Sequence, residues 1–337
     1  MFSKTQTTSF FLLCALPLLS AALPINVNVN TTLNDRAAAK TWAVADKYEG
    51  SNFFASFDFF SASDPTHGLV KYLKEADAKS KGLAKIENNI AVLGVDSKTK
   101  LSSGQNRDST RVSSKKKYNG GLFIYDVKRM PVGCSTWPAL WTVGGPSWPR
   151  QGEIDLFEGV NQSPNAKGGN QITMHTGSGC SIDKTAKISG KLSNHPSCES
   201  SGADNSGCAT MDSDPMSFGN GFNKNGGGVI AQLWDESDGI RVYFFARNKI
   251  PADIQKGAPT PARWGTPVSY LKFGSSCAAS HFKDHVITIN TALCGDWAGA
   301  AGVYSASGCP GTCASAVADP SNFEDAQWEI NYIHVYH

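Results

Sequence analysis

Short runs of apolar residues, many of them β-branched or aromatic, recur along the chain and are bounded by Gly, Asn, Asp or Pro. The clearest runs cover 121–127, 228–234, 240–245 and 286–289. Runs of this length and composition predict strands, whereas apolar positions at helical spacing are sparse outside 68–81. The 33 glycines supply many tight turns. The pattern therefore predicts an all-β fold, a two-sheet β-sandwich of the jelly-roll type.

The N-terminus has the layout of a secretory signal peptide. Lys4 precedes the apolar run 10–16, and the small residues Ser20-Ala21-Ala22 provide a cleavage site. We therefore expect residues 1–22 to be removed and the protein to be secreted and extracellular.

The rest of the chain predicts one folded domain behind a short leader. Residues 23–41 are rich in Asn and Ala with few aromatics, which predicts a mobile leader, and no linker interrupts 42–337. No later stretch reaches the roughly 20 uncharged residues of a membrane helix. The last residues, 331–337, predict a strand rather than the hydrophobic tail that precedes a lipid anchor. We therefore expect no membrane partner.

Cysteine usage points to disulfides. Of the nine cysteines, Cys14 lies in the predicted signal, which leaves an even number for an oxidising compartment. Metal binding is the competing interpretation, but the chain has no CxxC pair, and the Cys309 to Cys313 spacing lacks nearby histidines. Eight cysteines allow 105 pairings, and the sequence does not choose among them.

Charge composition indicates a neutral partner. Lys plus Arg number 31 against 29 for Asp plus Glu, and this balance argues against nucleic acid, which selects a basic face. The basic run 115–117 predicts a solvated strand edge. Asn30 and Asn161 begin triplets that fit the glycosylation pattern. We expect a monomer that binds a neutral polymer.

The run EIDLFE, which begins at Glu153, is the most informative stretch of the chain. On a regular strand Glu153 and Asp155 would share one face, and Glu158 would lie on the opposite face among core residues. A β-bulge near Leu156 or Phe157 removes this conflict, because one extra residue reverses the alternation. The sequence therefore predicts a bulge that returns Glu158 to the face of Glu153.

Two glutamates on one face at this spacing suit the cleavage of glycosidic bonds. With the bulge, their Cα atoms lie about 13 Å apart, as at positions i and i+4 of a regular strand. Side chains that lean together then approach the roughly 5 to 5.5 Å of a retaining glycosidase. In that scheme Glu153 is the nucleophile, Glu158 is the general acid/base, and Asp155 orients Glu153 by hydrogen bonding. The alternative is a strand whose acidic residues simply face solvent.

The same run, with Trp148-Pro149 before it and Gly159-Val160-Asn161 after it, resembles the active-site signature of glycoside hydrolase family 16, specifically the fungal laminarinase-like endo-1,3(4)-β-glucanases. The resemblance covers about 42–337. Its other motifs are Asn52-Phe53-Phe54, Phe57-Asp58-Phe59-Phe60, Asp64-Pro65-Thr66-His67-Gly68, Ser113-Ser114-Lys115-Lys116, Tyr118-Asn119-Gly120-Gly121-Leu122-Phe123, Trp137-Pro138-Ala139-Leu140-Trp141 and Cys294-Gly295-Asp296-Trp297-Ala298-Gly299. The resemblance implies a concave substrate cleft, a retaining mechanism and the same roles for Glu153, Asp155 and Glu158.

Aromatic side chains are the expected platforms for the apolar faces of glucose rings. The resemblance places Trp141, Trp148 and Trp297 in the cleft and His175 close to the acid/base. Trp137 is predicted to lie in the core or at the rim.

Taken together, these observations predict a secreted, endo-acting, retaining β-glucanase that hydrolyses 1,3- or mixed 1,3/1,4-β-glucans. Two alternatives stay open: a cell-wall glucan transglycosylase with the same glutamates, and a non-catalytic glucan-binding protein. No cofactor is required. The resemblance allows a structural calcium ion on the outer face, but the sequence identifies no ligands for it.

Overall fold

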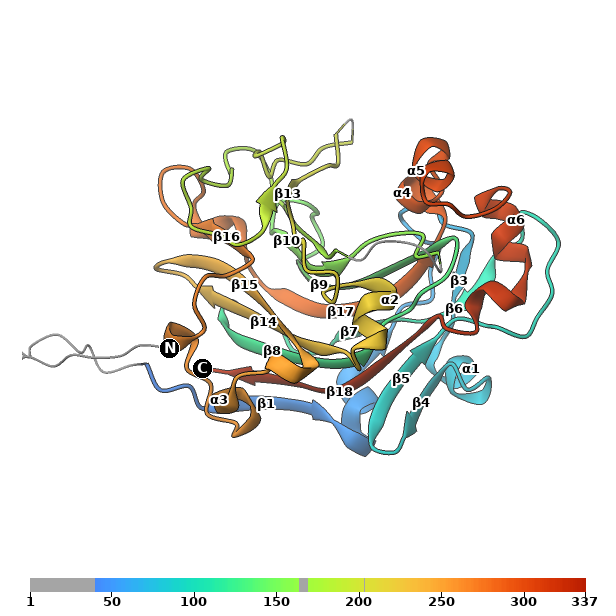
Figure 1. The fold of residues 1–337 in the computed structure, drawn as a ribbon, viewed down its shortest axis with the longest axis horizontal. Helices are drawn as coiled ribbons and strands as arrows, with labels where there is room; N and C mark the ends of the chain where they lie inside the picture. Colours follow the sequence, from blue (N-terminus) through green and yellow to red (C-terminus); the bar gives the residue numbers. More distant parts are fainter. Residues whose placement is uncertain (1–39, 164–168, 203) are drawn as a thin grey trace, which may run out of the picture. The chain divides into compact units, whose positions relative to one another are not determined.

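The computed structural model describes residues 40–163, 169–202 and 204–337 (Figure 1). The predicted signal peptide and nearly all of the predicted leader lie outside the described residues. Among the described residues, the main chain forms two large antiparallel sheets and one small parallel pair of strands.

Sheet A follows the order β16-β15-β14-β8-β18-β5-β4, with β1 paired to β18. Its strands are β1 (Val44–Glu49), β4 (Ala84–Glu87), β5 (Ile90–Gly94), β8 (Gly121–Arg129), β14 (Gly228–Asp235), β15 (Gly239–Ala246), β16 (Ser269–Lys272) and β18 (Gln327–Tyr336).

Sheet B follows the order β12-β13-β11-β10-β9-β17-β7-β2. Its strands are β2 (Phe57–Phe59), β7 (Arg111–Ser114), β9 (Thr136–Gly144), β10 (Glu153–Glu158), β11 (Gln171–His175), β12 (Lys191–Leu192), β13 (Cys208–Met211) and β17 (His285–Leu293). The small parallel pair consists of β3 (Val70–Tyr72) and β6 (Arg107–Ser109).

The helices of the described residues are short. They are α1 (Glu75–Ser80), α2 (Gly219–Lys224), α3 (Ala252–Gln255), α4 (Gly295–Ala298), α5 (Ala301–Ala306) and α6 (Cys313–Ala318), with 3₁₀ turns at Gly50–Ser56, Arg247–Lys249, Pro261–Arg263, Ala279–His281 and Pro320–Phe323. None of them has both the length and the apolar character needed to cross a bilayer.

The structure confirms the predicted strands, which lie within β8, β14, β15 and β17. The helical spacing noted over 68–81 corresponds to a helix only in the second half of that range. Val70 and Tyr72 are buried while Lys71 is exposed, which is the two-residue alternation of a strand, and the helix begins only at Glu75. The all-β sandwich is confirmed.

The main core lies between the two sheets, which face each other in Figure 1. Phe123, Tyr125 and Val127 of β8 point into this core together with Leu140 and Ile154 of sheet B. The intervening residues of β8, such as Leu122 and Ile124, belong to a smaller cluster on the other side of sheet A. Successive side chains of β8 thus alternate between two apolar clusters, and the strand is buried on both faces.

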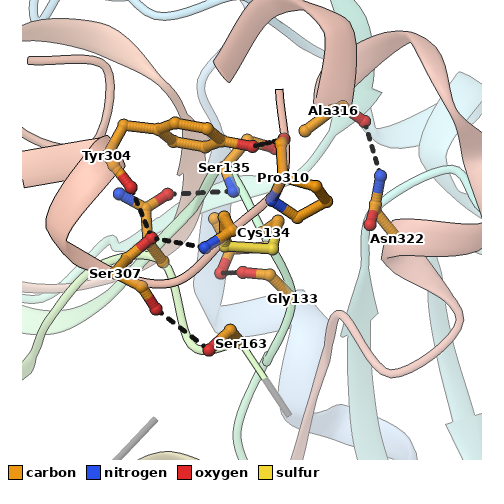
Figure 2. The surroundings of a disulfide bond; sticks show 12 residues. Gly133, Cys134, Ser135, Ser163, Tyr304, Ser307, Pro310, Ala316 and Asn322 are labelled. Atoms are coloured by element: carbon orange, nitrogen blue, oxygen red, sulfur yellow. Dashed lines mark hydrogen bonds between the residues drawn. A yellow bond between two sulfur atoms is a disulfide. The ribbon is translucent and has the colours of Figure 1, made fainter. Parts of the chain in front are cut away.

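All eight cysteines of the described residues form disulfides, as predicted. The pairs are Cys134–Cys309, Cys180–Cys277, Cys198–Cys208 and Cys294–Cys313. Two of them fix residues 295–323, here called the C-terminal helical segment, to the ends of β17 and β9. Figure 2 shows the Cys134 disulfide, beside which Ser163 donates a hydrogen bond to the carbonyl oxygen of Ser307.

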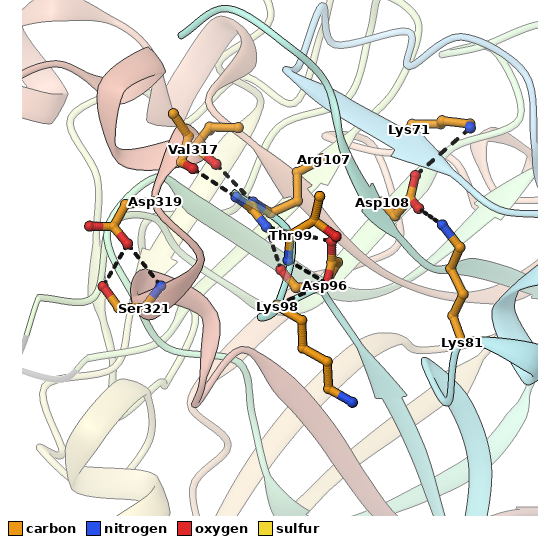
Figure 3. Close-up of polar contacts among 11 residues, drawn as sticks. Lys71, Lys81, Asp96, Lys98, Thr99, Arg107, Asp108, Val317, Asp319 and Ser321 are labelled. Atoms are coloured by element: carbon orange, nitrogen blue, oxygen red, sulfur yellow. Dashed lines mark hydrogen bonds and ion pairs between the residues drawn. The ribbon is translucent and has the colours of Figure 1, made fainter. Parts of the chain in front are cut away.

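A buried arginine holds the far end of the C-terminal helical segment. Arg107 of β6 is 0% exposed and donates to the carbonyl oxygens of Val317, Ala318 and Asp96 (Figure 3). A planar guanidinium can serve three carbonyls from one buried position, whereas a lysine ammonium cannot match this geometry. The segment is thus fixed by two disulfides and one arginine.

Candidate active site

Strand β10 contains the bulge that the sequence predicts. Asp155 pairs with Trp141 of β9, and Phe157 pairs with the next residue, Leu140, so Leu156 is the extra residue. The cause is burial: Leu156 and Phe157 are both 0% exposed, and both pack into the core. Two consecutive apolar side chains on the core side reverse the alternation.

The bulge brings the three acidic side chains to one face of sheet B, here called the carboxylate face. Glu153 pairs with Val143 of β9 and Glu158 pairs with Ala139, so five steps along β10 match four steps along β9. Glu158 therefore occupies the place of an i+4 residue relative to Glu153. The predicted return of Glu158 to the face of Glu153 is confirmed.

Each glutamate accepts a hydrogen bond from a different tryptophan. Trp148 donates its indole N–H to Oε2 of Glu153 at 2.9 Å, and Trp137 donates to Oε1 of Glu158 at 2.8 Å. Trp148 is 41% exposed, so its ring borders solvent beside Glu153. Trp137, predicted to lie in the core or at the rim, is half-buried and contacts the carboxylate of Glu158 directly. The ring of Trp297 packs edge-on against Trp137, with ring centroids 5.6 Å apart.

Asp155 is paired with His175 rather than with Glu153. Nε2 of His175 lies 3.1 Å from Oδ2 of Asp155, and Nδ1 of His175 lies 2.8 Å from Oγ of Ser200. A carboxylate oxygen of Asp155 lies within 4.8 Å of one of Glu153, and no hydrogen bond joins the two groups among the described residues. The role of Asp155 in orienting Glu153 therefore stays a prediction.

Burial raises the pKa of all three carboxyl groups. The pKa values of Glu153 and Glu158 rise to about 8, chiefly through burial and then through the charge of Asp155, while the indole N–H that each accepts acts in the opposite direction. Burial raises the pKa of Asp155 to about 8 as well. Like charges in one desolvated site cannot all ionise near neutral pH, so the site retains a proton.

Trp141 lies on the carboxylate face opposite Asp155. Its indole N–H donates to Oδ1 of Asn290 at 2.7 Å, and the guanidinium of Arg111 lies 5.0 Å from its ring centroid. Sequence reasoning missed Asn290 and Arg111, because neither residue is near the acidic run in the chain. All four residues predicted around the glutamates (Trp141, Trp148, His175 and Trp297) are therefore brought together with them.

The structural calcium ion that the resemblance allows stays a prediction. Within the described residues, Glu153, Asp155 and His175 form the one group of three acidic, histidine or cysteine side chains whose ligand atoms converge, and it lies at the site itself rather than on the outer face. Calcium prefers six to eight oxygen ligands, and this trio offers two carboxylates and a nitrogen.

Asn161 has a structural role that excludes a glycan at this position of the folded chain. It is 1% exposed, its Oδ1 accepts the N–H of Ser135, and its Nδ2 donates to the carbonyl oxygen of Ala298. Asn30, the other acceptor predicted from sequence, lies outside the described residues.

A jelly-roll sandwich with two carboxyl groups on one face, bordered by tryptophans, defines the class of carbohydrate-cleaving jelly rolls. Comparison with known proteins narrows this class. The family model for the XgeA-like, catalytic domain of glycoside hydrolase family 16 matches residues 57–336. The chain belongs to glycoside hydrolase family 16.

Curated relatives carry matching names. A probable glycosidase of Schizosaccharomyces pombe is 40% identical over 301 residues, which cover 88% of this chain and 70% of that protein. A probable endo-1,3(4)-β-glucanase of Aspergillus niger is 41% identical over 312 residues, which cover 89% of this chain but only 40% of that protein. The chain thus spans less than half the length of the second relative.

Solved structures agree with this assignment. Laminarinase 16A from Phanerochaete chrysosporium, described with two β-glucans in its donor and acceptor sites, matches with a TM-score of 0.82 and 38% identity, covering 88% of this chain and 100% of that chain. An elongating family 16 β-1,3-glucosyltransferase matches with a TM-score of 0.79 and 36% identity over the same shares of the two chains.

Proposed function

We propose that the chain is a secreted, monomeric, endo-acting β-glucanase that hydrolyses 1,3- or mixed 1,3/1,4-β-glucans with retention of configuration. One observation carries the proposal: the bulge in β10 places Glu153 and Glu158 on one face, with each carboxylate oriented by its own indole N–H. Two carboxyl groups that face one sugar ring are the apparatus of a retaining glycosidase.

In the first step, ionised Glu153 attacks the anomeric carbon, and the bond between this carbon and the glycosidic oxygen breaks. Protonated Glu158 donates its proton to the departing oxygen, so the leaving sugar departs neutral. In the second step, the Glu158 carboxylate takes a proton from water, and the water oxygen displaces Glu153 from the anomeric carbon. Glu158 thereby regains its proton, and no metal takes part.

The environment of Glu158 suits both of its roles. Once Glu153 is esterified, one negative charge leaves the site, and the repulsion that holds a proton on Glu158 weakens. Glu158 then serves as a base. Asp155, paired with His175, places a third carboxyl group between the two glutamates, where its charge helps to keep the acid/base protonated in the resting enzyme.

A neutral glucan fits the aromatic surroundings of the glutamates. Trp148, Trp137 and Trp297 border the two carboxyl groups, and Trp141 adds a further indole on the same face. Glucose rings present apolar faces that pack on such planes. The names of the relatives, endo-1,3(4)-β-glucanase and laminarinase, support β-1,3-linked glucose as the substrate.

Transglycosylation is the second candidate, and the likeness to the elongating glucosyltransferase favours it. Both activities share the glycosyl-enzyme. They differ in whether water or a sugar hydroxyl reaches this intermediate first. A binding-only function has no comparable support, because both glutamates are present in a family 16 catalytic domain.

Digestion of laminarin, lichenan, xyloglucan and agarose tests the proposal, with products followed by mass spectrometry and the newly formed anomer by NMR. We expect shorter products from laminarin or lichenan and the β-anomer first. Products longer than the substrate would identify a transglycosylase, and an initial α-anomer would exclude retention. Glu153→Gln and Glu158→Gln should each lose most activity on polymer while remaining folded, and dialysis against a chelator should leave wild-type activity unchanged.

A further inference from the structure

The bulge in β10 leaves backbone groups without partners in the strand ladder, and one side chain satisfies two of them. On the β11 side, Asp155 pairs with Thr173 and Glu158 pairs with Gln171, so the ladder is broken between Asp155 and Glu158. An unpaired backbone group in the interior is destabilising, because it loses its hydrogen bonds to water and gains none in the protein. The bulge therefore needs another hydrogen-bonding partner.

Asn170, which directly precedes β11, fills this gap. Its Oδ1 accepts the N–H of Glu158 at 2.9 Å, and its Nδ2 donates to the carbonyl oxygen of Leu156 at 2.7 Å. One amide thus bridges the extra residue of the bulge and the catalytic glutamate.

Asn170 is itself held rigidly. It is 2% exposed, its backbone N–H donates to Oγ of Ser217, and its carbonyl oxygen accepts the N–H of Asp212. With all four polar groups used, the side chain has one orientation. The amide has the donor and the acceptor that the broken ladder lacks, whereas an aspartate carboxylate or an alanine does not.

We infer that Asn170 is a positioning residue that fixes the β10 bulge and, through it, the placement of the Glu158 carboxyl group against the substrate. The inference rests on the proposed role of Glu158 as acid/base. It assigns to Asn170 no contact with substrate. Loss of its amide should disturb proton transfer more than sugar binding, because the tryptophans that border the site are held by β9, the C-terminal helical segment and the loop before β10.

The experiment compares Asn170→Ala and Asn170→Asp with a matched control, Asn223→Ala. Asn223 of α2 makes the same pair of bonds, accepting the N–H of Met130 and donating to its carbonyl oxygen, both at 2.9 Å. Its amide therefore holds the residue after β8 of sheet A and makes neither of the two bonds that bridge the bulge. Asn170→Asp keeps the size of the side chain and its acceptor for Glu158. It therefore serves as the test variant if Asn170→Ala does not fold.

We expect the Asn170 variants to lower kcat on laminarin about 100-fold, the effect of a misplacement of about 1 Å, with KM within about threefold of wild type. Asn223→Ala should lose comparable thermal stability and keep its kcat. A kcat within about threefold of wild type in both Asn170 variants would overturn the inference, as would an equal loss in the control.

A spectroscopic readout separates this inference from the proposed function, because it needs no substrate. The indole N–H of Trp137 reports the position of Glu158, and that of Trp148 reports Glu153. In ¹H–¹⁵N spectra assigned with single Trp→Phe variants, we expect the Trp137 indole signal to move in the Asn170 variants and the Trp148 signal to stay. An unmoved Trp137 signal would refute the positioning role even if the wild-type protein proved active on no glucan.

Discussion

At the scale of single residues, each glutamate of the pair has its own donor. Trp148 precedes Glu153 in the same hairpin, and Trp137 reaches Glu158 from the neighbouring strand. An indole N–H favours the ionised form of the carboxyl group that accepts it, so the two tryptophans tune two different steps of the proposed reaction. Sequence pattern alone assigned Trp137 to core or rim, because its contact depends on strand pairing.

Removing these donors should move opposite limbs of the pH profile. Trp148→Phe raises the pKa of Glu153, so the acidic limb of kcat/KM moves to higher pH, since the nucleophile must be ionised. Trp137→Phe raises the pKa of Glu158, so the alkaline limb moves to higher pH, since the acid must be protonated. The loss of one hydrogen bond to a charged carboxylate corresponds to a pKa shift of about one unit. Because Trp148 is exposed to solvent, the shift in Trp148→Phe should be the smaller of the two.

Trp264→Phe is the matched control for these profiles. Its indole N–H donates to Oδ2 of Asp253 at 3.0 Å, outside the site, so its loss removes the same kind of bond without touching either glutamate. The pH profile of this variant should equal that of wild type. If Trp137→Phe moves the acidic limb, or if neither tryptophan variant moves a limb, the assignment of roles to Glu153 and Glu158 is wrong.

At the scale of elements, the sequence predicted the bulge because a regular strand would have buried Glu158 beside Leu156. Asn170, whose amide bridges the bulge, was not predictable, because the sequence does not define the path of the loop that separates it from β10. The same holds for the disulfide pairs. Eight cysteines indicated bridges, but which ends meet depends on how the C-terminal helical segment folds back on β9 and β17.

The Cys294–Cys313 bridge should affect substrate binding as well as stability. Trp297 follows Cys294 in α4 and packs on Trp137. Replacing both cysteines by alanine removes a closed loop of 19 residues, and we expect the free energy of unfolding to fall by about 3 kcal/mol. KM for laminarin should rise because Trp297 loses its anchor.

Cys180→Ala/Cys277→Ala is the comparison for this prediction. That bridge joins the loop after β11 to the loop after β16 and has no contact with Trp297 among those described here. The loss of this bridge should lower the denaturation midpoint with little change in KM. A KM for the Cys294/Cys313 variant equal to that of wild type would show that the bridge supports the fold alone.

At the scale of the molecule, the two sheets build a core large enough to carry buried acids on the face of one of them. Asp155 is 3% exposed and Glu158 is 9% exposed, positions that favour the neutral form of a carboxyl group. The fold class followed from alternation and turn composition. The raised pKa values of the three carboxyl groups did not follow from the sequence, because they depend on which residues cover these groups.

Stability should therefore fall with rising pH through the carboxyl groups of the site. The pKa of Glu158 is about 8 in the folded chain against an ordinary 4.5. Its contribution is fully present below pH 4.5 and is lost as the pH rises towards 8. Glu158→Gln removes this loss. The free energy of unfolding of the variant should therefore exceed that of wild type by about 1–2 kcal/mol at pH 8 and by almost nothing at pH 4.

Glu329→Gln should show the opposite trend. Burial acts to raise the pKa of Glu329, but the hydrogen bonds from Lys128 and Gln327 and the positive charge of Lys128 outweigh it, so the pKa is lowered. Its contribution is present above pH 4.5 and is lost as the pH falls, so this variant should be less stable than wild type at pH 8. Thermal unfolding of both variants between pH 4 and pH 8 provides the measurement. A stability difference for Glu158→Gln that does not grow with pH would contradict the account.

Trapping the covalent intermediate identifies the nucleophile. A 2-deoxy-2-fluoro laminaribioside with a good leaving group slows the second step, so the glycosyl-enzyme accumulates and the labelled peptide can be sequenced by mass spectrometry. We expect one sugar adduct per chain, on Glu153, and none in Glu153→Gln. An adduct on Glu158 or on Asp155, or steady turnover of glucan with no adduct on any carboxyl group, would contradict it.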